Sequence, residues 1–125
     1  MSNTITLNRE TKETTIELAL NINGSQQVSI DTGLPFFDHM LNQLATHAGW
    51  DLTLKSTGDL EVDDHHLIED VAICLGQAFN QAWRQQGKIV RYGQRLLPMD
   101  ASLLMVAVDV CGRAYSITDL PFSRE

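Results

Sequence analysis

Residues 63–70 read Asp-Asp-His-His-Leu-Ile-Glu-Asp and so combine two histidines with four carboxylates. An aspartate followed by apolar residues three and four positions apart predicts that a long helix begins here. Side chains four residues apart are neighbours on a helix, so His65 stands beside Glu69 and His66 beside Asp70. The two imidazoles then point roughly 100° apart, which suits two ions better than one. Imidazole and carboxylate donors without a thiolate favour a divalent transition metal.

A structural interpretation of this cluster is also open, because carboxylates near a helix N-terminus are stabilised by the helix dipole without any function. Against it, this turn of helix carries no Lys or Arg. The apolar stripe predicted for the helix also places His66 nearly opposite the core and His65 near its edge. A ligand that faces away from its own core needs partners from another element. His66 therefore predicts a site that is completed by a second unit or by another subunit.

Two more histidines, His39 and His47, lie on the polar side of an earlier predicted helix. They are eight residues apart, about 12 Å along the helix axis, so one metal cannot bind both. We expect His39 to be a metal ligand and His47 a substrate contact or proton-transfer group, with a plain surface role as the alternative for each.

Arg91 and Arg113 are candidate phosphate contacts because a guanidinium binds oxyanions in a bidentate way, or they are ordinary surface charges.

The composition limits the class of protein. A length of 125 residues with 43% hydrophobic content predicts one domain with a core of its own. A net charge of -7 disfavours a nucleic acid as the main partner, and no apolar run is long enough to span a membrane. The polar N-terminus does not resemble a secretion signal, and two cysteines are too few for a disulfide framework. We therefore expect a reduced, cytoplasmic enzyme or binding protein.

Hydrophobic periodicity predicts an α+β fold with helices on one face of a sheet. Strands are predicted at 5–7, 14–22, 26–31 and 51–56, and later at 101–110 and 113–117. The second and third of these are predicted to form a hairpin at Asn23-Gly24. Helices are predicted at 35–48 and at about 64–86. The core stripe predicted for the second helix is Ile68, Val71, Ala72, Leu75, Ala78, Phe79 and Ala82.

The segment 29–36 has an echo at 116–122, about 87 residues later, and the strand before each copy ends near a turn glycine. This repeat predicts a complete half-domain, residues 1–90, followed by the first strands of a second, duplicated half, residues 91–125.

Motifs spread from about residue 9 to residue 122 resemble the imidazoleglycerol-phosphate dehydratase family of histidine biosynthesis. These motifs are Arg9-x-Thr11-Lys12-Glu13-Thr14, Asp31-Thr32-Gly33-Leu34-Pro35-Phe36-Phe37-Asp38-His39-Met40, Leu44-Ala45-x-His47, Asp63-Asp64-His65-His66-x-x-Glu69-Asp70 and Arg91-Tyr92-Gly93. The resemblance covers the N-terminal two-thirds of the family chain. It implies a duplicated half-domain in which a four-stranded sheet carries two helices on one face.

The resemblance also implies a hydro-lyase that converts imidazole glycerol phosphate to imidazole acetol phosphate with two manganese ions per site. It implies that the metal ligands are His39, His65, His66 and Glu69, and that the proton-transfer residues are Glu13 and His47. The substrate contacts are then these six residues together with Arg91 and Arg113. The residue types alone also suit other divalent metals. Because a ligating histidine must be neutral, we expect metal loss below about pH 6.

The chain lacks the second His-His-x-x-Glu set and the lysine that the family carries in its second half. The resemblance implies that each metal draws ligands from both halves, across the subunits of a homo-oligomer. About half of the coordination sphere is therefore present, and we expect impaired dehydration by the 125-residue form. The alternative is a non-catalytic, oligomeric fragment that binds metal or phosphate.

Overall fold

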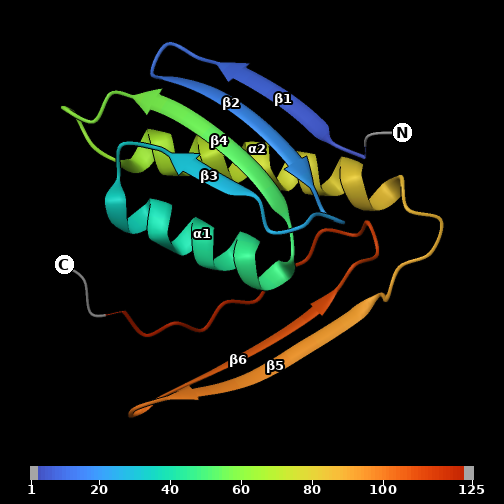
Figure 1. Cartoon of the computed structure of the whole chain (residues 1–125). Helices are drawn as coiled ribbons and strands as arrows, with labels where there is room; N and C mark the ends of the chain where they lie inside the picture. The colour runs from blue at the N-terminus through green and yellow to red at the C-terminus, as the bar shows by residue number, and fades with distance from the viewer. Residues whose placement is uncertain (1–2, 123–125) are drawn as a thin grey trace. The chain divides into compact units, whose positions relative to one another are not determined.

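The structure is a computed structural model that describes residues 3–122. The chain divides into two compact units, the first ending at Gly87 and the second beginning at Lys88. The first unit contains four strands and two helices, and the second contains two strands (Figure 1). The predicted fold class is confirmed, since a four-stranded sheet with two helices is followed by the strands of another sheet.

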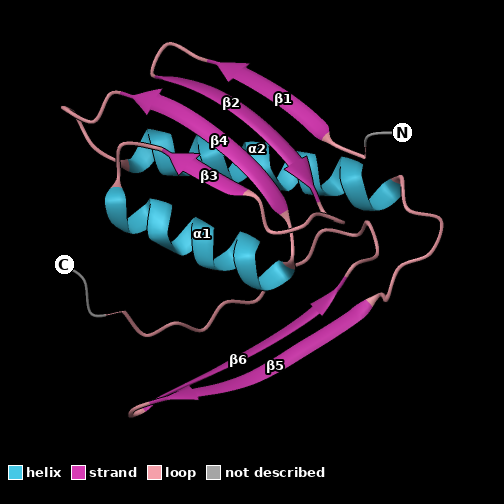
Figure 2. Ribbon diagram, in the orientation of Figure 1, coloured by secondary structure: helices cyan, strands magenta, loops and turns pink. Residues whose placement is uncertain are grey.

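The first unit is built on a mixed sheet (Figure 2). Its strands are β1 Ile5–Glu10, β2 Thr14–Asn21, β3 Val28–Asp31 and β4 Asp51–Gly58. Their order in the sheet is β1-β2-β4-β3. β2 is antiparallel to both β1 and β4, and β3 is parallel to β4.

The hairpin predicted between the second and third strands is wrong, because β4 lies between β2 and β3. The loop at Gly24 is instead held by Asp51, whose Oδ1 accepts hydrogen bonds from the N–H groups of Ser25 (2.7 Å) and Gln27 (2.9 Å). These backbone donors, Gln27 first, lower the pKa of the Asp51 carboxyl. The loop is tight, because a Cβ on Gly24 would lie 2.2 Å from the backbone nitrogen of Asp51.

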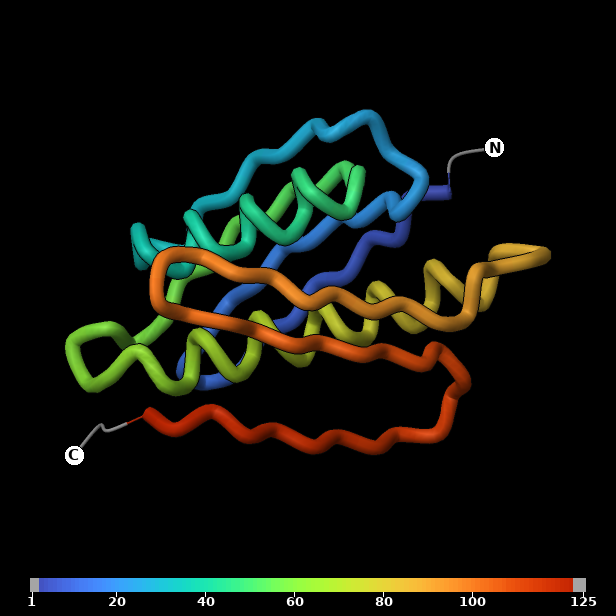
Figure 3. Tube along the Cα trace, turned by 90° about the horizontal axis from the view of Figure 1, so that it is seen from below, coloured from blue at the N-terminus to red at the C-terminus, as the bar shows by residue number. Residues whose placement is uncertain are grey.

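One face of the sheet is buried and the other is exposed. The buried face carries Ile5, Ile16, Leu18, Leu20, Leu52 and Leu54. The residues between them along β2 and β4 are exposed, as Glu17 and Lys55 are, or half-buried, as Ala19 is. This face is buried because α1 Pro35–Ala48 and α2 His65–Arg84 both pack on it. Figure 3 shows the two helices side by side over the strands.

The buried side of α2 is rotated from the predicted stripe. Its buried residues are Leu67, Asp70, Val71, Cys74, Ala78 and Ala82. Ala72 is exposed and Ile68 is only half-buried, contrary to prediction. The rotation has a polar cause, since Asp70 is only 9% exposed and pairs with strand residues. With the helix turned this way, His65 rather than His66 lies farthest from the core.

The second unit is an antiparallel hairpin of β5 Tyr92–Met99 and β6 Ser102–Asp109. Asp100 forms its turn with a φ of 50°. The predicted strand at 101–110 corresponds to β6. Its strand partner at 92–99 was missed, and the strand predicted at 113–117 is wrong.

The hairpin matches the start of the first unit at the offset predicted from the repeat. Moving β1 and β2 along the chain by 87 residues gives 92–97 and 101–108, which lie within β5 and within one residue of β6. In the first unit β3 pairs only with β4. The equivalent of β3, residues 115–118, has no such partner among the described residues and is not a strand.

Candidate metal and substrate site

The start of α2 is fixed by a tight connection from β4. The carbonyl of Asp59 accepts hydrogen bonds from the N–H groups of Val62 (2.8 Å) and Asp63 (3.3 Å). Asp64 is the N-cap residue, but the side chain that caps the helix is that of Asp63, whose Oδ1 accepts the N–H of His65 at 3.0 Å. The two histidines therefore follow immediately after a well-held helix start.

His65 and Glu69 form the pair predicted from their spacing of four residues. His65 Nε2 lies 3.1 Å from Glu69 Oε2, and both side chains are exposed, at 70% and 58%. Two ligands that bind one cation at right angles through bonds of about 2.1 Å are about 3 Å apart. The pair therefore has the spacing of a nitrogen–oxygen chelate for one divalent cation.

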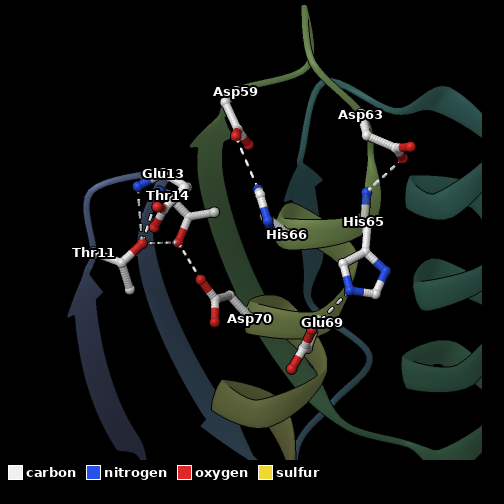
Figure 4. Close-up of polar contacts among 9 residues, drawn as sticks. All are labelled: Thr11, Glu13, Thr14, Asp59, Asp63, His65, His66, Glu69 and Asp70. Carbon is white, nitrogen blue, oxygen red and sulfur yellow. Dashed lines mark hydrogen bonds and ion pairs between the residues drawn. The ribbon is translucent and has the colours of Figure 1, made fainter.

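His66 makes a different contact from the one predicted. Its Nδ1 lies 2.9 Å from Oδ2 of Asp59, whereas the predicted neighbour, Asp70, turns toward the strands. Figure 4 shows His66 pointing to Asp59 and His65 pointing away from it, toward Glu69. The hydrogen bond that the imidazole donates to Asp59 is the main cause that raises the pKa of His66. Asp59 was not predicted because it precedes the helix. A spacing of three or four residues indicates neighbouring side chains only within a helix.

The turn that carries Glu13 is tied to α2 through Asp70. Arg9 binds Asp70 Oδ1 through Nη2 (2.9 Å) and Nε (3.1 Å), and the Thr14 hydroxyl donates to Asp70 Oδ2 at 2.5 Å. Since a hydroxyl has one proton, Thr14 accepts from the Thr11 hydroxyl at 3.1 Å. Thr11 in turn accepts the N–H groups of Glu13 (3.1 Å) and Thr14 (2.9 Å). This chain of hydrogen bonds fixes the backbone that presents Glu13 (Figure 4).

An open pocket of about 270 Å³ lies between this turn and the end of β4. Its lining residues are Thr11, Lys12, Glu13, Thr14, Thr15, Thr57, Gly58, Asp59 and Glu61. The pocket brings Glu13 and Asp59 together from distant parts of the sequence. The charge of Glu13 also contributes to the raised pKa of His66. Glu13, Asp59 and His66 therefore belong to one polar region.

His39 and His47 are both exposed on α1. The helix start beside His39 is fixed because Asp38 Oδ1 accepts hydrogen bonds from the N–H (2.9 Å) and hydroxyl (2.5 Å) of Thr32. His47 Nε2 lies 3.3 Å from Gln43 Oε1. No three His, Cys, Asp or Glu side chains among residues 3–122 are placed to hold a metal together. His39 therefore does not join His65 and Glu69 within one chain, and its ligand role stays a prediction.

Arg91 and Arg113 belong to the second unit. The Arg91 guanidinium is engaged by Asp109, with Nε at 2.5 Å from Oδ1 and Nη2 at 3.0 Å from Oδ2. It also lies 5.1 Å from the centre of the Tyr92 ring. Its bidentate face, which a phosphate contact requires, is thus occupied by a carboxylate. Arg113 is exposed after β6. The phosphate role of both residues stays a prediction.

The fold and the histidine–carboxylate pairs define an α+β protein with a candidate metal centre at the start of a helix. A family model for imidazoleglycerol-phosphate dehydratase matches residues 32–125. The chain therefore belongs to the imidazoleglycerol-phosphate dehydratase family, and the resemblance predicted from the motifs is confirmed.

Individual relatives agree with this assignment. The chain is 52% identical to imidazoleglycerol-phosphate dehydratase of Acidothermus cellulolyticus over 116 residues, which is 93% of this chain and 56% of the relative. It is 50% identical to that of Methanocaldococcus jannaschii over 117 residues, which is 94% of this chain and 58% of the relative. The chain thus spans less than two thirds of the length of these relatives.

Solved structures agree as well. The crystal structure of the dehydratase from Staphylococcus aureus has a TM-score of 0.79 and 31% identity, covering 90% of this chain and 60% of that one. The structure of the Pyrococcus furiosus enzyme in complex with (S)-C348 has a TM-score of 0.68 and 36% identity, covering 82% of this chain and 53% of that one. In the part of the chain that the structure describes, no helix is long and apolar enough to cross a membrane.

Proposed function

We propose that this chain is part of a metal-dependent hydro-lyase of histidine biosynthesis, which dehydrates imidazole glycerol phosphate to imidazole acetol phosphate in the cytoplasm. Family membership supports the reaction. The observation that carries the site is the pair of adjacent histidines at the start of α2, each beside its own carboxylate and facing a different direction.

The donor set fits two divalent cations. His65 and Glu69 offer a nitrogen and an oxygen 3.1 Å apart to one ion. His66 has its Nδ1 on Asp59, which leaves Nε2 for another ion. His39 supplies a further nitrogen from α1. When bound, the metals supply Lewis-acid stabilisation of negative charge on the substrate imidazole. Manganese is proposed from the family, since the same donors also suit zinc, cobalt or iron.

The remaining groups orient the substrate and move protons. The reaction breaks one C–H and one C–O bond, releases water and leaves an enol that becomes the ketone. Glu13, on the turn beside His66, is placed to accept a hydrogen bond from a substrate hydroxyl or to take a proton. His47 is the second proton-transfer group. The cationic side chains of Arg91 and Arg113 bind the phosphate, for which Arg91 must first leave Asp109.

Other copies of the chain complete the site in this proposal. A pair of donors from α2 does not hold a catalytic metal alone, because such sites use at least three protein ligands. Since no group of three exists within residues 3–122 of one copy, we propose a homo-oligomer with sites between subunits and impaired turnover by this chain. A non-catalytic fragment that binds metal or phosphate is the second candidate, favoured by the same observation.

Metal analysis combined with a dehydration assay tests the proposal. Bound manganese with turnover supports the hydro-lyase. Bound metal without turnover favours the non-catalytic fragment. A chain that binds no divalent metal at any concentration contradicts the metal-dependent hydro-lyase, and a chain that binds neither metal nor phosphate contradicts the fragment as well.

Replacing Glu69 with Gln should exchange an anionic carboxylate ligand for a neutral amide and weaken metal binding by about 10-fold or more, with little effect on folding because Glu69 is exposed. Isothermal titration with Mn²⁺ measures the affinity, and circular dichroism measures the folding. The matched control is Glu61→Gln, which removes the same charge from the preceding turn. Equal metal affinity in the two variants would show that Glu69 is not a ligand.

A further inference from the structure

Asp59 lies outside every motif that the sequence analysis identified, yet it forms a hydrogen bond with the imidazole of His66. Its Oδ2 is 2.9 Å from His66 Nδ1 (Figure 4). The Asp59 side chain is 19% exposed, against 46% for His66. The carboxylate is thus the more enclosed member of the pair.

The position of Asp59 is set by the backbone rather than by its contact with His66. Its carbonyl closes the connection to α2 by accepting the N–H groups of Val62 and Asp63. The residue before it, Gly58, is closely packed, because a Cβ there would lie 3.2 Å from the side chain of Leu67. The end of β4 therefore lies directly against the first turn of α2. This close approach holds the carboxylate beside the helix whatever the imidazole does.

The hydrogen bond has a chemical consequence for His66. A neutral imidazole has one N–H, and a carboxylate at Nδ1 holds the proton on that nitrogen. Nε2 then keeps its lone pair, and the ring of His66 makes no other hydrogen bond with residues 3–122. The other oxygen of Asp59, Oδ1, is buried without a protein hydrogen-bond partner. His66 is therefore the only side chain to which this carboxylate is bonded among the described residues.

The adjacent histidine, His65, does not share the Nδ1–carboxylate contact of His66. In His65 it is Nε2 that faces a carboxylate, that of Glu69, and both side chains are largely exposed. The two adjacent histidines are thus held through opposite nitrogens, one by a residue on the same helix and the other by a residue before it.

We propose that Asp59 is a positioning residue that fixes the Nδ1–H tautomer and the orientation of His66, so that Nε2 is the atom offered to a divalent cation. The choice of Nε2 as a metal-binding atom rests on the proposed function. The fixed tautomer does not, and it can be measured without metal.

The first test is the ring ¹⁵N spectrum of the metal-free 125-residue chain at about pH 9, with the signals of His66 assigned by comparison with His66→Gln. The proposal expects a protonated Nδ1 and an unprotonated Nε2 in the unmodified chain. In Asp59→Ala the ring should become a mixture of tautomers. The control Asp63→Asn removes a charge from the same connection but bonds to the backbone of His65, and it should leave the His66 tautomer unchanged. A protonated Nε2 in the unmodified chain overturns the proposal, and so does an unchanged spectrum in Asp59→Ala.

The second test is calorimetric titration of the same chains with Mn²⁺. Asp59→Ala should bind about 10- to 100-fold more weakly than Asp63→Asn, because outer groups that orient a ligating histidine have effects of that size. Equal affinities in these two variants contradict the role of Asp59. Absence of Mn²⁺ binding in all chains, together with a fixed Nδ1–H tautomer, contradicts the proposed function while leaving the positioning role of Asp59 supported.

Discussion

At the scale of single residues, the acidic cluster separates into groups with different partners. Glu69 faces His65 at the surface, whereas Asp70, the next residue, is buried against Arg9 and Thr14. A third carboxylate near the helix start, that of Asp59, comes from outside the motif and contacts His66. The acidic run therefore contacts one histidine and one strand turn, and the other histidine is held by a carboxylate that precedes the run.

The buried carboxylate of Asp70 should make the first unit sensitive to acid. The hydrogen bond from Thr14 is the largest cause that lowers the pKa of Asp70 below the ordinary value of 3.8. The hydrogen bonds and the positive charge of Arg9 lower it further. A carboxyl whose pKa is lowered by folding stabilises the fold above its unfolded pKa, and this stabilisation is lost as pH falls through the folded pKa. Stability should therefore fall in the range below about pH 4. Asp70→Asn should cost about 2 kcal/mol at pH 7, as expected for hydrogen bonds to a charged group.

Urea unfolding at pH 7, 5 and 3 measures this effect. Asp70→Asn should lose less stability between pH 5 and 3 than the unmodified chain, because the titrating group is gone. Glu17→Gln, on the exposed face of β2, is the control and should behave as the unmodified chain does. An equally steep loss in Asp70→Asn would assign the acid sensitivity to another group.

At the scale of elements, the order of strands in the sheet follows the long β2–β4 pairing and not the local turn sequence Asn23-Gly24. Asn-Gly favours a two-residue hairpin, and the sequence around it alternates as a hairpin should. However, β2 pairs with β4 along eight residues, from Thr14 opposite Gly58 to Asn21 opposite Asp51. That ladder buries the apolar faces of both strands under the helices, which a β2–β3 hairpin would not do for β4.

Gly24→Ala tests the loop that replaces this hairpin. A Cβ would meet both the backbone and the side chain of Asp51 within 2.6 Å, so the loop must shift and break the hydrogen bonds that Asp51 accepts. We expect a loss of about 1–3 kcal/mol in the free energy of unfolding. Gly76→Ala is the control, since this helical glycine has no atom within 4 Å of an added Cβ. It should stabilise α2 by roughly 0.5–1 kcal/mol. A neutral Gly24→Ala in thermal or urea unfolding would contradict this close approach.

At the scale of the whole molecule, the described core belongs to the first unit. Its buried apolar residues run from Ile5 to Ala82. The residues of β5 and β6 are exposed throughout, including Leu96, Leu103 and Met105. An isolated two-stranded hairpin is marginally stable at best, so the two units should differ greatly in local stability.

Hydrogen exchange should show this difference directly. In dilute, monomeric chain, the amides of β2 and β4 should be protected to the level of global unfolding, whereas those of β5 and β6 should exchange many-fold faster. Mass spectrometry of peptides from each strand measures both rates in one sample. Equal protection of β6 and β2 would show that the hairpin has a stable core of its own. Protection of β6 that rises with chain concentration would indicate association between copies.

The sequence by itself determined the α+β class, both helices, the repeat of 87 residues and the pairing of His65 with Glu69. The helices and the pairing of His65 with Glu69 follow from periodicity or spacing along a single element, where sequence distance fixes spatial distance. The fold class follows from the order of those elements, and the repeat from similarity between two segments. Only the tertiary structure decided that β4 separates β2 from β3, that Asp70 is buried, and that Asp59 rather than Asp70 holds His66. These depend on contacts between segments far apart in the chain, where the area buried by a whole ladder and the pairing of a buried charge outweigh local preference.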